Sequence, residues 1–153
     1  MDLNALASQA HALLGGELRL RQVTLVLQLA PSLPAVWGDA VQLQQVLANL
    51  LLNAIDALQA IPPRQRSLVL ATQATPTGVQ LSVQDNGPGL SGTPPEKLFE
   101  PFYSTKPDGL GVGLSISRSI VEQHGGRLQV EQPATGGLRF CVNLPAAGAA
   151  RLS

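Results

Sequence analysis

Residues 86–113 are the stretch that most restricts how this chain can fold, because eleven of them are Gly or Pro. Glycine and proline at that density interrupt helices and strands, so we expect no regular element here. A loop of this length inside a compact domain is usually functional or disordered. With 153 residues, the chain has the size of one domain. We therefore expect a single domain, residues 1–153, with one long irregular loop.

The composition excludes several classes of function. Charged residues make up 13% of the chain, and ten Lys and Arg balance ten Asp and Glu. Nucleic-acid binders and membrane-surface binders need concentrated positive charge, so we expect neither nucleic-acid binding nor direct membrane contact. The single cysteine excludes a disulfide framework and a cysteine-based metal site. No apolar run reaches the roughly 18 residues of a membrane span, and the N-terminus lacks signal-peptide features, which favours a cytoplasmic protein.

Hydrophobic periodicity gives the order of the expected elements. Helices are expected at residues 3–14, from the N-cap Asp39 up to Pro62, and at 114–124; strands are expected at 23–29, 67–75, 79–84, 127–132 and 138–144. The last four strands form two hairpins. Hairpins and separate helices in this order predict an α/β sandwich, in which a mixed sheet has its helices on one face.

The central expected helix carries three polar side chains, Asn49, Asn53 and Asp56. Spacings of four and three residues place them on one face. Asn and Asp are disfavoured inside helices because their side chains compete for backbone hydrogen bonds. An amide oxygen is a suitable neutral ligand for Mg²⁺, which also takes phosphate oxygens. This polar stripe, taken alone, is explained equally well by a solvated helix face.

Two glycine-rich motifs flank the long loop. Asp85–Gly89 follows an expected strand, and a carboxylate there can accept a hydrogen bond from the amine of adenine. Taken alone, this motif is better explained as an ordinary Asp-Gly turn. Gly109–Leu114 runs into a helix, whose free N–H groups and positive dipole form an anion site. A flexible linker is the alternative for this second motif.

The combination and order of these motifs resemble the ATP-binding domain of histidine kinases, within the gyrase/chaperone/kinase/mismatch-repair ATPase superfamily. The corresponding boxes are an N box at Gln45–Ala54, a G1 box at Asp85–Gly89, an F box at Leu98–Lys106 and a G2 box at Gly109–Leu114, with Gly136 and Gly137 at a weaker third glycine box. The resemblance extends from about residue 2 to Pro145 and is closest to sensor kinases for nitrogen, oxygen and dicarboxylates. It implies a Bergerat fold, an α+β two-layer sandwich with a mixed, mostly antiparallel sheet of about five strands and three helices on one face.

The resemblance also implies ATP and Mg²⁺ as cofactors and assigns the site residues. Asn53 would hold the metal with the help of Asn49, and Asp85 would bind the adenine amino group. Residues 90–108 would form an ATP lid. The other implied positions are Gly87 and Gly89 at the adenine wall, Gly109, Gly111 and Gly113 around the phosphates, and Phe99 and Phe102 as anchors of the lid. Further nucleotide contacts are expected from Asp56, Phe102, Thr105, Lys106, Leu110, Val112 and Leu114.

One position separates kinases from hydrolases in this superfamily. The hydrolysing members place a Glu one helical turn before the magnesium Asn, and that carboxylate activates the attacking water. This sequence has Asn49 there, and an amide cannot accept a proton at neutral pH. We therefore expect an ATP-dependent protein-histidine kinase domain with Asn49, Asn53 and Lys106 in its catalytic machinery, because phosphoryl transfer needs mainly positioning and charge neutralisation.

Two features depart from the pattern of many relatives. No Lys or Arg occurs between Gln22 and Pro63, where many relatives have a basic residue next to or inside the N box. We expect Lys106 to meet the phosphate charge, with Arg118 as the alternative. Leu138 stands where many relatives have a small residue or Thr, which puts adenine contacts at that position in doubt.

The phospho-acceptor histidine is expected to lie outside this chain. No acidic residue follows His11, unlike the acceptor box of these kinases, and we expect His124 to cap a helix end. The chain would then donate the γ-phosphoryl group of ATP to a histidine on a separate dimerisation domain, with a response-regulator receiver domain downstream. The alternatives are a non-catalytic nucleotide-binding or docking module and a protein-serine kinase of the same superfamily. The resemblance leaves open whether residues 1–14 end a connecting segment and whether the parent kinase is anchored in a membrane.

Overall fold

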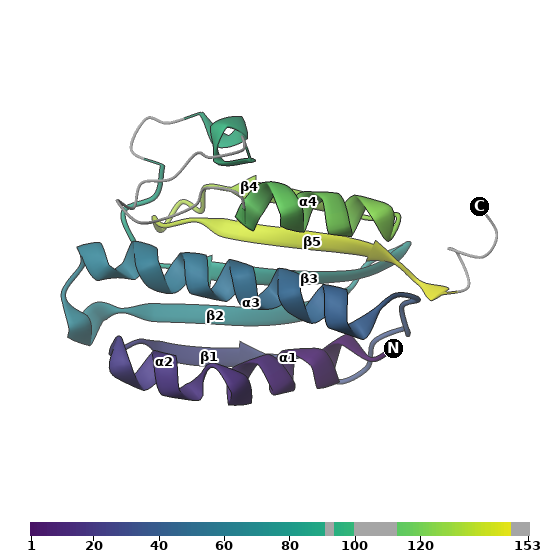
Figure 1. The fold of residues 1–153 in the computed structure, drawn as a ribbon, viewed down its shortest axis with the longest axis horizontal. Coiled ribbons are helices and arrows are strands. Elements are labelled where there is room, and N and C mark those ends of the chain that lie inside the picture. The colour runs from purple at the N-terminus through teal and green to yellow at the C-terminus, as the bar shows by residue number, and fades with distance from the viewer. Residues whose placement is uncertain (91–93, 100–112, 148–153) are drawn as a thin grey trace.

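The computed structural model describes residues 1–90, 94–99 and 113–147. The helices are α1 (Leu3–Leu13), α2 (Gly15–Leu20), α3 (Ala40–Ala57) and α4 (Gly113–Gln123), with short 3₁₀ helices η1 (Leu58–Ala60), η2 (Pro63–Gln65) and η3 (Pro95–Phe99). The strands are β1 (Thr24–Gln28), β2 (Ser67–Ala74), β3 (Gly78–Asp85), β4 (Arg127–Glu131) and β5 (Arg139–Pro145) (Figure 1). None of the helices within these ranges is long and apolar enough to cross a membrane.

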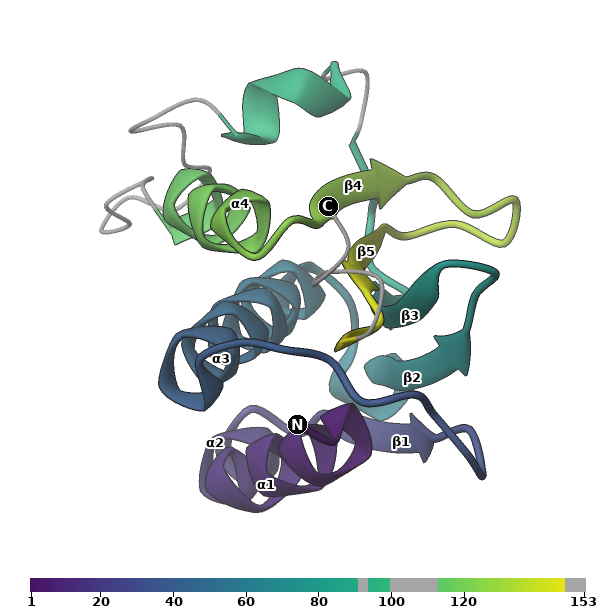
Figure 2. The ribbon, with the colours of Figure 1, turned by 90° about the vertical axis from the view of Figure 1, so that its right-hand side faces the viewer.

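The five strands form one mixed sheet in the order β1-β2-β3-β5-β4. β1 pairs with β2 in parallel, whereas the β2–β3, β3–β5 and β4–β5 pairs are antiparallel. Figure 2 shows α1, α2, α3 and α4 together on one face of the sheet. The two-layer sandwich expected from the sequence is therefore confirmed, with the short α2 as an addition to the three expected helices.

Alternating burial along β3 and the N-cap of α3 explain how these two elements form and pack against each other. In β3, Val79, Leu81 and Val83 alternate with more polar residues and belong to the buried core. α3 contributes seven buried side chains to the same core. This helix begins after Asp39, as expected, because the Asp39 carboxylate accepts hydrogen bonds from two backbone N–H groups of its first turn.

The structure differs from the sequence-based expectation inside the long loop. We expected no regular element there, but η3 forms one 3₁₀ turn at Pro95–Phe99. A short 3₁₀ turn tolerates proline at its first position, where the missing N–H would have no partner. Phe99 is buried and packs edge-on against Phe140, with ring centroids 6.4 Å apart. The turn is thus held to the core by an aromatic contact that the loop composition did not reveal.

His124 joins the C-terminal end of α4 to the N-terminal end of α3. Its Nδ1 lies 2.8 Å from the carbonyl oxygen of Ile120, and its Nε2 accepts a hydrogen bond from the Asp39 N–H at 3.1 Å. Because Nε2 accepts, Nδ1 is the ring nitrogen that can donate to the α4 carbonyl oxygen. A Cβ on Gly38 would lie 2.4 Å from His124 Cδ2, so only glycine fits against this ring. The expected position of His124 at the end of α4 is confirmed, and the same ring also contacts the residue before α3.

Candidate functional site

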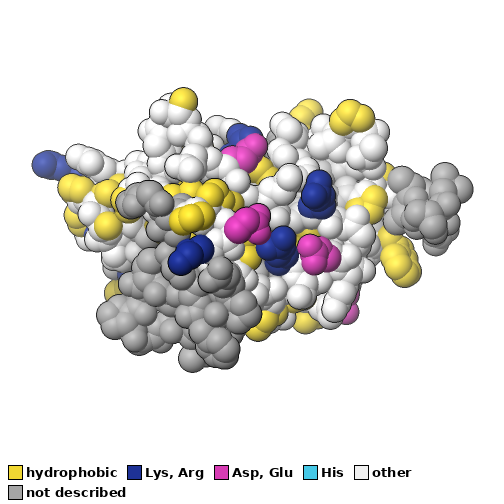
Figure 3. All heavy atoms as spheres, turned by 90° about the horizontal axis from the view of Figure 1, so that it is seen from above, with side chains coloured by type: hydrophobic (Ala, Val, Ile, Leu, Met, Phe, Trp, Pro, Cys, Tyr) yellow, Lys and Arg dark blue, Asp and Glu magenta, His cyan; other side chains and the backbone are white. Residues whose placement is uncertain are grey.

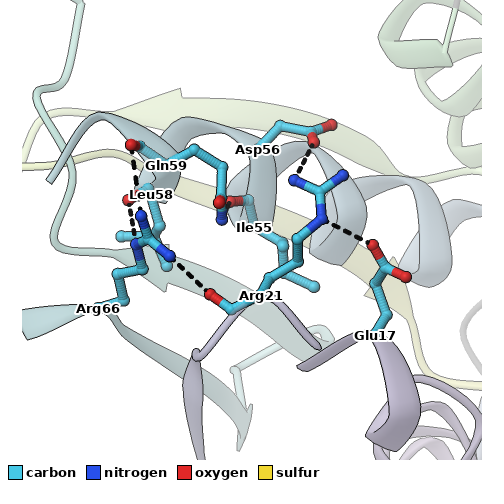
Figure 4. Close-up of polar contacts among 7 residues, drawn as sticks. All are labelled: Glu17, Arg21, Ile55, Asp56, Leu58, Gln59 and Arg66. Carbon is cyan, nitrogen blue, oxygen red and sulfur yellow. Dashed lines mark hydrogen bonds and ion pairs between the residues drawn. The ribbon is translucent and has the colours of Figure 1, made fainter. Parts of the chain in front are cut away.

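The polar stripe of α3 contacts α4 near one end and the turn after α2 near the other. The Asn49 Nδ2 donates to the Oγ of Ser117 in α4 at 3.4 Å, and Ser117 is fully buried. Asp56 Oδ1 lies 3.6 Å from Nη1 of Arg21 (Figure 4). The side-chain amide of Asn53, between them, makes no hydrogen bond within the described part of the chain. All three stripe residues are partly exposed, so a ligand can reach them.

Asp85 places a carboxylate in the interior at the end of β3. The residue is only 4% exposed. Its Oδ1 accepts hydrogen bonds from the backbone N–H of Gly87 at 2.8 Å and of Leu138 at 3.4 Å. Burial raises the pKa of the Asp85 carboxyl above its usual value, and these two hydrogen bonds oppose that rise only in part. Oδ2 has no hydrogen-bond partner among the described residues, so it remains available to a ligand donor.

Three glycines allow the backbone to approach Asp85 from several sides. A Cβ on Gly87 would lie 3.1 Å from Asp85 Oδ1 and 3.4 Å from the carbonyl oxygen of Ala57, so this loop rests on the C-terminal end of α3. Gly89 and Gly137 both have φ of +78°, and a Cβ on Gly137 would lie 2.0 Å from the Asp85 carbonyl oxygen. Sequence reasoning marked Gly137 only as part of a weak glycine box. The glycine pair before an alternating run was the available signal, but the close approach to Asp85 depends on the pairing of β3 with β5.

Leu138 contacts Asp85 through its backbone. The Asp85 N–H donates to the Leu138 carbonyl oxygen at 2.9 Å, and the Leu138 N–H donates to Asp85 Oδ1. The Leu138 side chain is buried in the core. These backbone contacts do not depend on which side chain occupies position 138, so this departure from the family pattern leaves the support of Asp85 intact.

The G2 box enters the described structure only at its end. Gly113 is the first residue of α4, and Leu114 packs partly buried against the core. α4 has 11 residues, long enough for its N-terminal N–H groups and dipole to favour an anion. The remaining expected residues of this region, Phe102, Thr105, Lys106, Gly109, Leu110, Gly111 and Val112, lie outside the described residues, as does most of the expected lid.

Arg118 is already engaged in other contacts. Its guanidinium lies 3.2 Å from Glu96 and 3.6 Å from Glu122. The same group stacks over the Phe99 ring, 4.9 Å from the centroid. Figure 3 shows basic and acidic side chains interspersed on this side of the molecule. We therefore keep Lys106, and not Arg118, as the expected phosphate cation of the loop.

The described residues restrict how a metal could be bound. No group of three or more His, Cys, Asp or Glu side chains in the described ranges could hold a metal ion. A metal here would need the amide oxygens of Asn53 and Asn49, completed by ligand oxygens, and this donor set suits Mg²⁺ with a phosphate. A hollow of about 220 Å³ lies over the sheet face opposite the helices, and none of the expected site residues lines it.

Comparisons with known proteins identify the family of this chain. The sequence pattern of the histidine kinase-, DNA gyrase B-, and HSP90-like ATPase family matches residues 38–148. The sensor protein TdiS of Thauera aromatica is 38% identical over 94% of this chain and 27% of its own length. The sensor protein FixL of Bradyrhizobium diazoefficiens is 43% identical over 95% of this chain and 29% of its own length. The chain thus spans less than a third of either relative.

Solved structures show the same fold. The catalytic domain of the histidine kinase ThkA is 30% identical, with a TM-score of 0.85 over 99% of this chain and 97% of that domain. ShkA in complex with AMPPNP is 28% identical, with a TM-score of 0.83 over 96% of this chain and 30% of ShkA. ThkA in complex with the response regulator TrrA is 28% identical, with a TM-score of 0.81 over 96% of this chain and 41% of that one. The chain belongs to the histidine kinase-, DNA gyrase B- and HSP90-like ATPase family.

Proposed function

We propose that this domain binds Mg·ATP and donates the γ-phosphoryl group to a histidine on a separate dimerisation domain of a two-component sensor kinase. The observation that carries the proposal is the buried carboxylate of Asp85, whose Oδ2 lacks a partner in the described structure while the Asn-bearing helix ends beside its loop. The open oxygen of this carboxylate is a hydrogen-bond acceptor that a ligand donor can reach. The exocyclic amine of adenine is such a donor.

The described residues would then have distinct roles in binding the nucleotide. Asp85 orients the adenine, and the backbone at Gly87 and Gly89 forms the wall against which the base lies. Asn53, assisted by Asn49, would hold Mg²⁺, which supplies neutralisation of phosphate charge. The N-terminal N–H groups of α4 add positive potential at the phosphates.

Asn49 favours transfer to a protein nucleophile over hydrolysis. Its amide donates to Ser117 and cannot take a proton from water at neutral pH. Without a general base the γ-phosphoryl group persists until an imidazole is presented. His11 is exposed near the end of α1 and has no acidic neighbour in sequence, so we place the acceptor on another domain.

The partners follow from the proposed transfer. We infer a dimerisation and acceptor domain of the parent kinase as the direct partner and a response-regulator receiver domain downstream. The ThkA structure with its response regulator TrrA and the sensor proteins TdiS and FixL support this inference. We further propose a cytoplasmic location. Residues 1–14, whose helix α1 packs into the domain core, would be where the connecting segment joins the domain.

We expect γ-labelled ATP to leave this isolated chain unlabelled and to label a dimerisation domain that carries an acceptor histidine. Radiolabel is measured on each protein after separation, with acid treatment to distinguish acid-labile phosphohistidine from acid-stable phosphoserine. Stable label on this chain or on a serine would contradict the proposal and favour a serine kinase. Absence of nucleotide binding would favour a docking module.

Asn53→Ala is expected to remove most of the magnesium dependence of ATP binding. Loss of a metal ligand should weaken Mg·ATP binding about 10- to 100-fold, on the scale seen for the groups around metal sites, and should leave metal-free ATP binding within about twofold. Titration with a fluorescent ATP analogue, with Mg²⁺ and with EDTA, measures both. Val41→Ala, at an exposed position in the first turn of the same helix and outside the N box, is the control. An equal loss with and without Mg²⁺ would show that Asn53 does not act through the metal.

A further inference from the structure

We propose that Arg21 is a phosphate-binding residue of this site, supplying from outside the N box the positive charge that α3 lacks. This inference rests on the proposed function. It concerns a residue that lies 35 positions before Asp56 in sequence and that the motifs do not include.

The need for such a cation follows from the charges around the stripe. No Lys or Arg occurs from Gln22 to Pro63, the stretch that includes all of α3. The acidic residues Asp56 and Asp85 lie on the stripe and at the end of β3. A nucleotide phosphate brought beside the Asp56 carboxylate is repelled unless cations compensate. Arg118 lies on α4, where, within the described residues, it contacts two glutamates and the Phe99 ring and no residue of the stripe.

Arg21 brings a guanidinium onto the stripe with donors to spare. Its Nε lies 3.0 Å from Glu17 Oε1, and its Nη1 lies 3.6 Å from Asp56 Oδ1 (Figure 4). The guanidinium has five N–H donors, and Nη2 has no partner among the described residues. The side chain is 36% exposed. A phosphate oxygen can therefore take the remaining donors without breaking either ion pair.

The backbone of Arg21 is fixed to the C-terminal end of the central helix. The guanidinium of Arg66 donates to the carbonyl oxygens of Arg21 at 2.7 Å, Leu58 at 2.8 Å and Ile61 at 3.1 Å. The next residue, Gln22, has φ of +57°, a conformation that non-glycine residues rarely adopt. These contacts hold Arg21 in place before any ligand binds, which lowers the entropy cost of binding. They also show that Arg66 uses its own donors on carbonyl groups.

The position along α3 indicates which part of the nucleotide Arg21 would meet. Gly87 contacts the carbonyl of Ala57, so the adenine end of the proposed site lies at the C-terminal end of the helix. Asn53 lies about one turn earlier. Asp56 falls between these two points, so the guanidinium beside it lies next to the phosphates that connect the nucleoside with the metal.

Arg21→Ala is expected to weaken ATP and ADP binding about tenfold, as for loss of one charge-assisted hydrogen bond at a partly exposed site, and to leave adenosine binding unchanged. Arg21→Lys keeps the charge and should stay within about threefold of the wild type. Arg19→Ala removes an exposed arginine from the last turn of α2 and should change nothing. Isothermal titration with ATP, ADP and adenosine measures each affinity, and urea unfolding measures stability.

The outcomes separate this inference from the proposed function. Wild-type protein that binds ATP, together with an Arg21→Ala variant of unchanged ATP affinity, overturns the role of Arg21 alone. Wild-type protein that does not bind ATP overturns the proposed function and this inference with it. Equal losses of ATP and adenosine affinity, accompanied by lower stability and by the same losses in Arg21→Lys, would show a purely structural ion pair and overturn phosphate binding. Selective loss of the phosphorylated ligands supports it.

Discussion

Asp85→Asn is expected to lower ATP affinity at least about 100-fold while leaving the domain folded. The amide keeps the size of the side chain and can still accept from the N–H groups of Gly87 and Leu138. It then turns its NH₂ toward the place of the adenine amine, so two donors face each other in a buried position. Two donors that face each other in a buried position, with no acceptor between them, cost about 3 kcal/mol of binding free energy. This cost lowers the affinity about 100-fold.

The same substitution is expected to stabilise the domain without nucleotide at neutral pH. Burial raises the pKa of Asp85 above 3.8 in the folded state. A raised pKa means that the folded state holds the proton more tightly than the unfolded chain, so stability is full below about pH 3.8 and is lost as the pH rises through the folded value. The substituted amide carries no charge at any of these pH values, so the stability of the variant relative to the wild type should increase as the pH rises above about 3.8.

Two measurements test these expectations together. Fluorescent-nucleotide titration gives the affinity, and urea unfolding followed by circular dichroism at several pH values gives the stability. Asn86 is adjacent but anchors the loop through Ser67 and Gln65, so Asn86→Ala should lower stability, in contrast to Asp85→Asn. Unchanged ATP affinity in Asp85→Asn would contradict the adenine assignment. A pH-independent stability difference would contradict the burial cost.

Gly137→Ala is expected to destabilise the domain by at least about 3 kcal/mol, in the range of severe single substitutions. A Cβ at this position would lie 2.0 Å from the Asp85 carbonyl oxygen and 3.1 Å from the Asn86 Cα. Both atoms belong to backbone, so neither can rotate away. The residue also has φ of +78°, which alone costs about 1 kcal/mol or more for alanine. The loop at Gly137 must therefore shift, and the Leu138 N–H that donates to the Asp85 carboxylate shifts with it.

Gly136→Ala is the matched control. Gly136 has φ of +98°, but a Cβ there would meet nothing within 4 Å. The expected loss is therefore limited to backbone strain, about 1–2 kcal/mol. Urea unfolding of both variants gives the comparison, and ATP titration shows whether Gly137→Ala also weakens binding. Equal losses of stability in the two variants would show that the contact with Asp85 contributes nothing.

Features that depend on spacing within one helix or strand are predictable from the sequence. The stripe of Asn49, Asn53 and Asp56 follows from the helical repeat, and the N-cap Asp39 fixed where that helix begins. The order of hairpins and helices predicted the two-layer fold. Each of these depends on interactions between residues close in sequence, and such interactions leave a visible pattern.

Contacts between distant elements could not be predicted in the same way. The ion pair of Arg21 with Asp56 and the approach of Gly137 to Asp85 depend on how helices and strands pack. The turn at Pro95–Phe99 forms where local composition opposes it, because the burial of Phe99 against Phe140 outweighs that preference. Tertiary packing overrides local propensity at such positions.

The two polar contacts between α3 and α4 have a mechanical consequence. Asn49 bonds to Ser117 near the middle of α4, and His124 bonds to Asp39 just beyond its end. Two attachment points oppose sliding or pivoting of one helix against the other, because either movement would break at least one of these hydrogen bonds. A ligand bound at the N-terminal end of α4 would therefore meet a helix whose position relative to α3 is already fixed at two points.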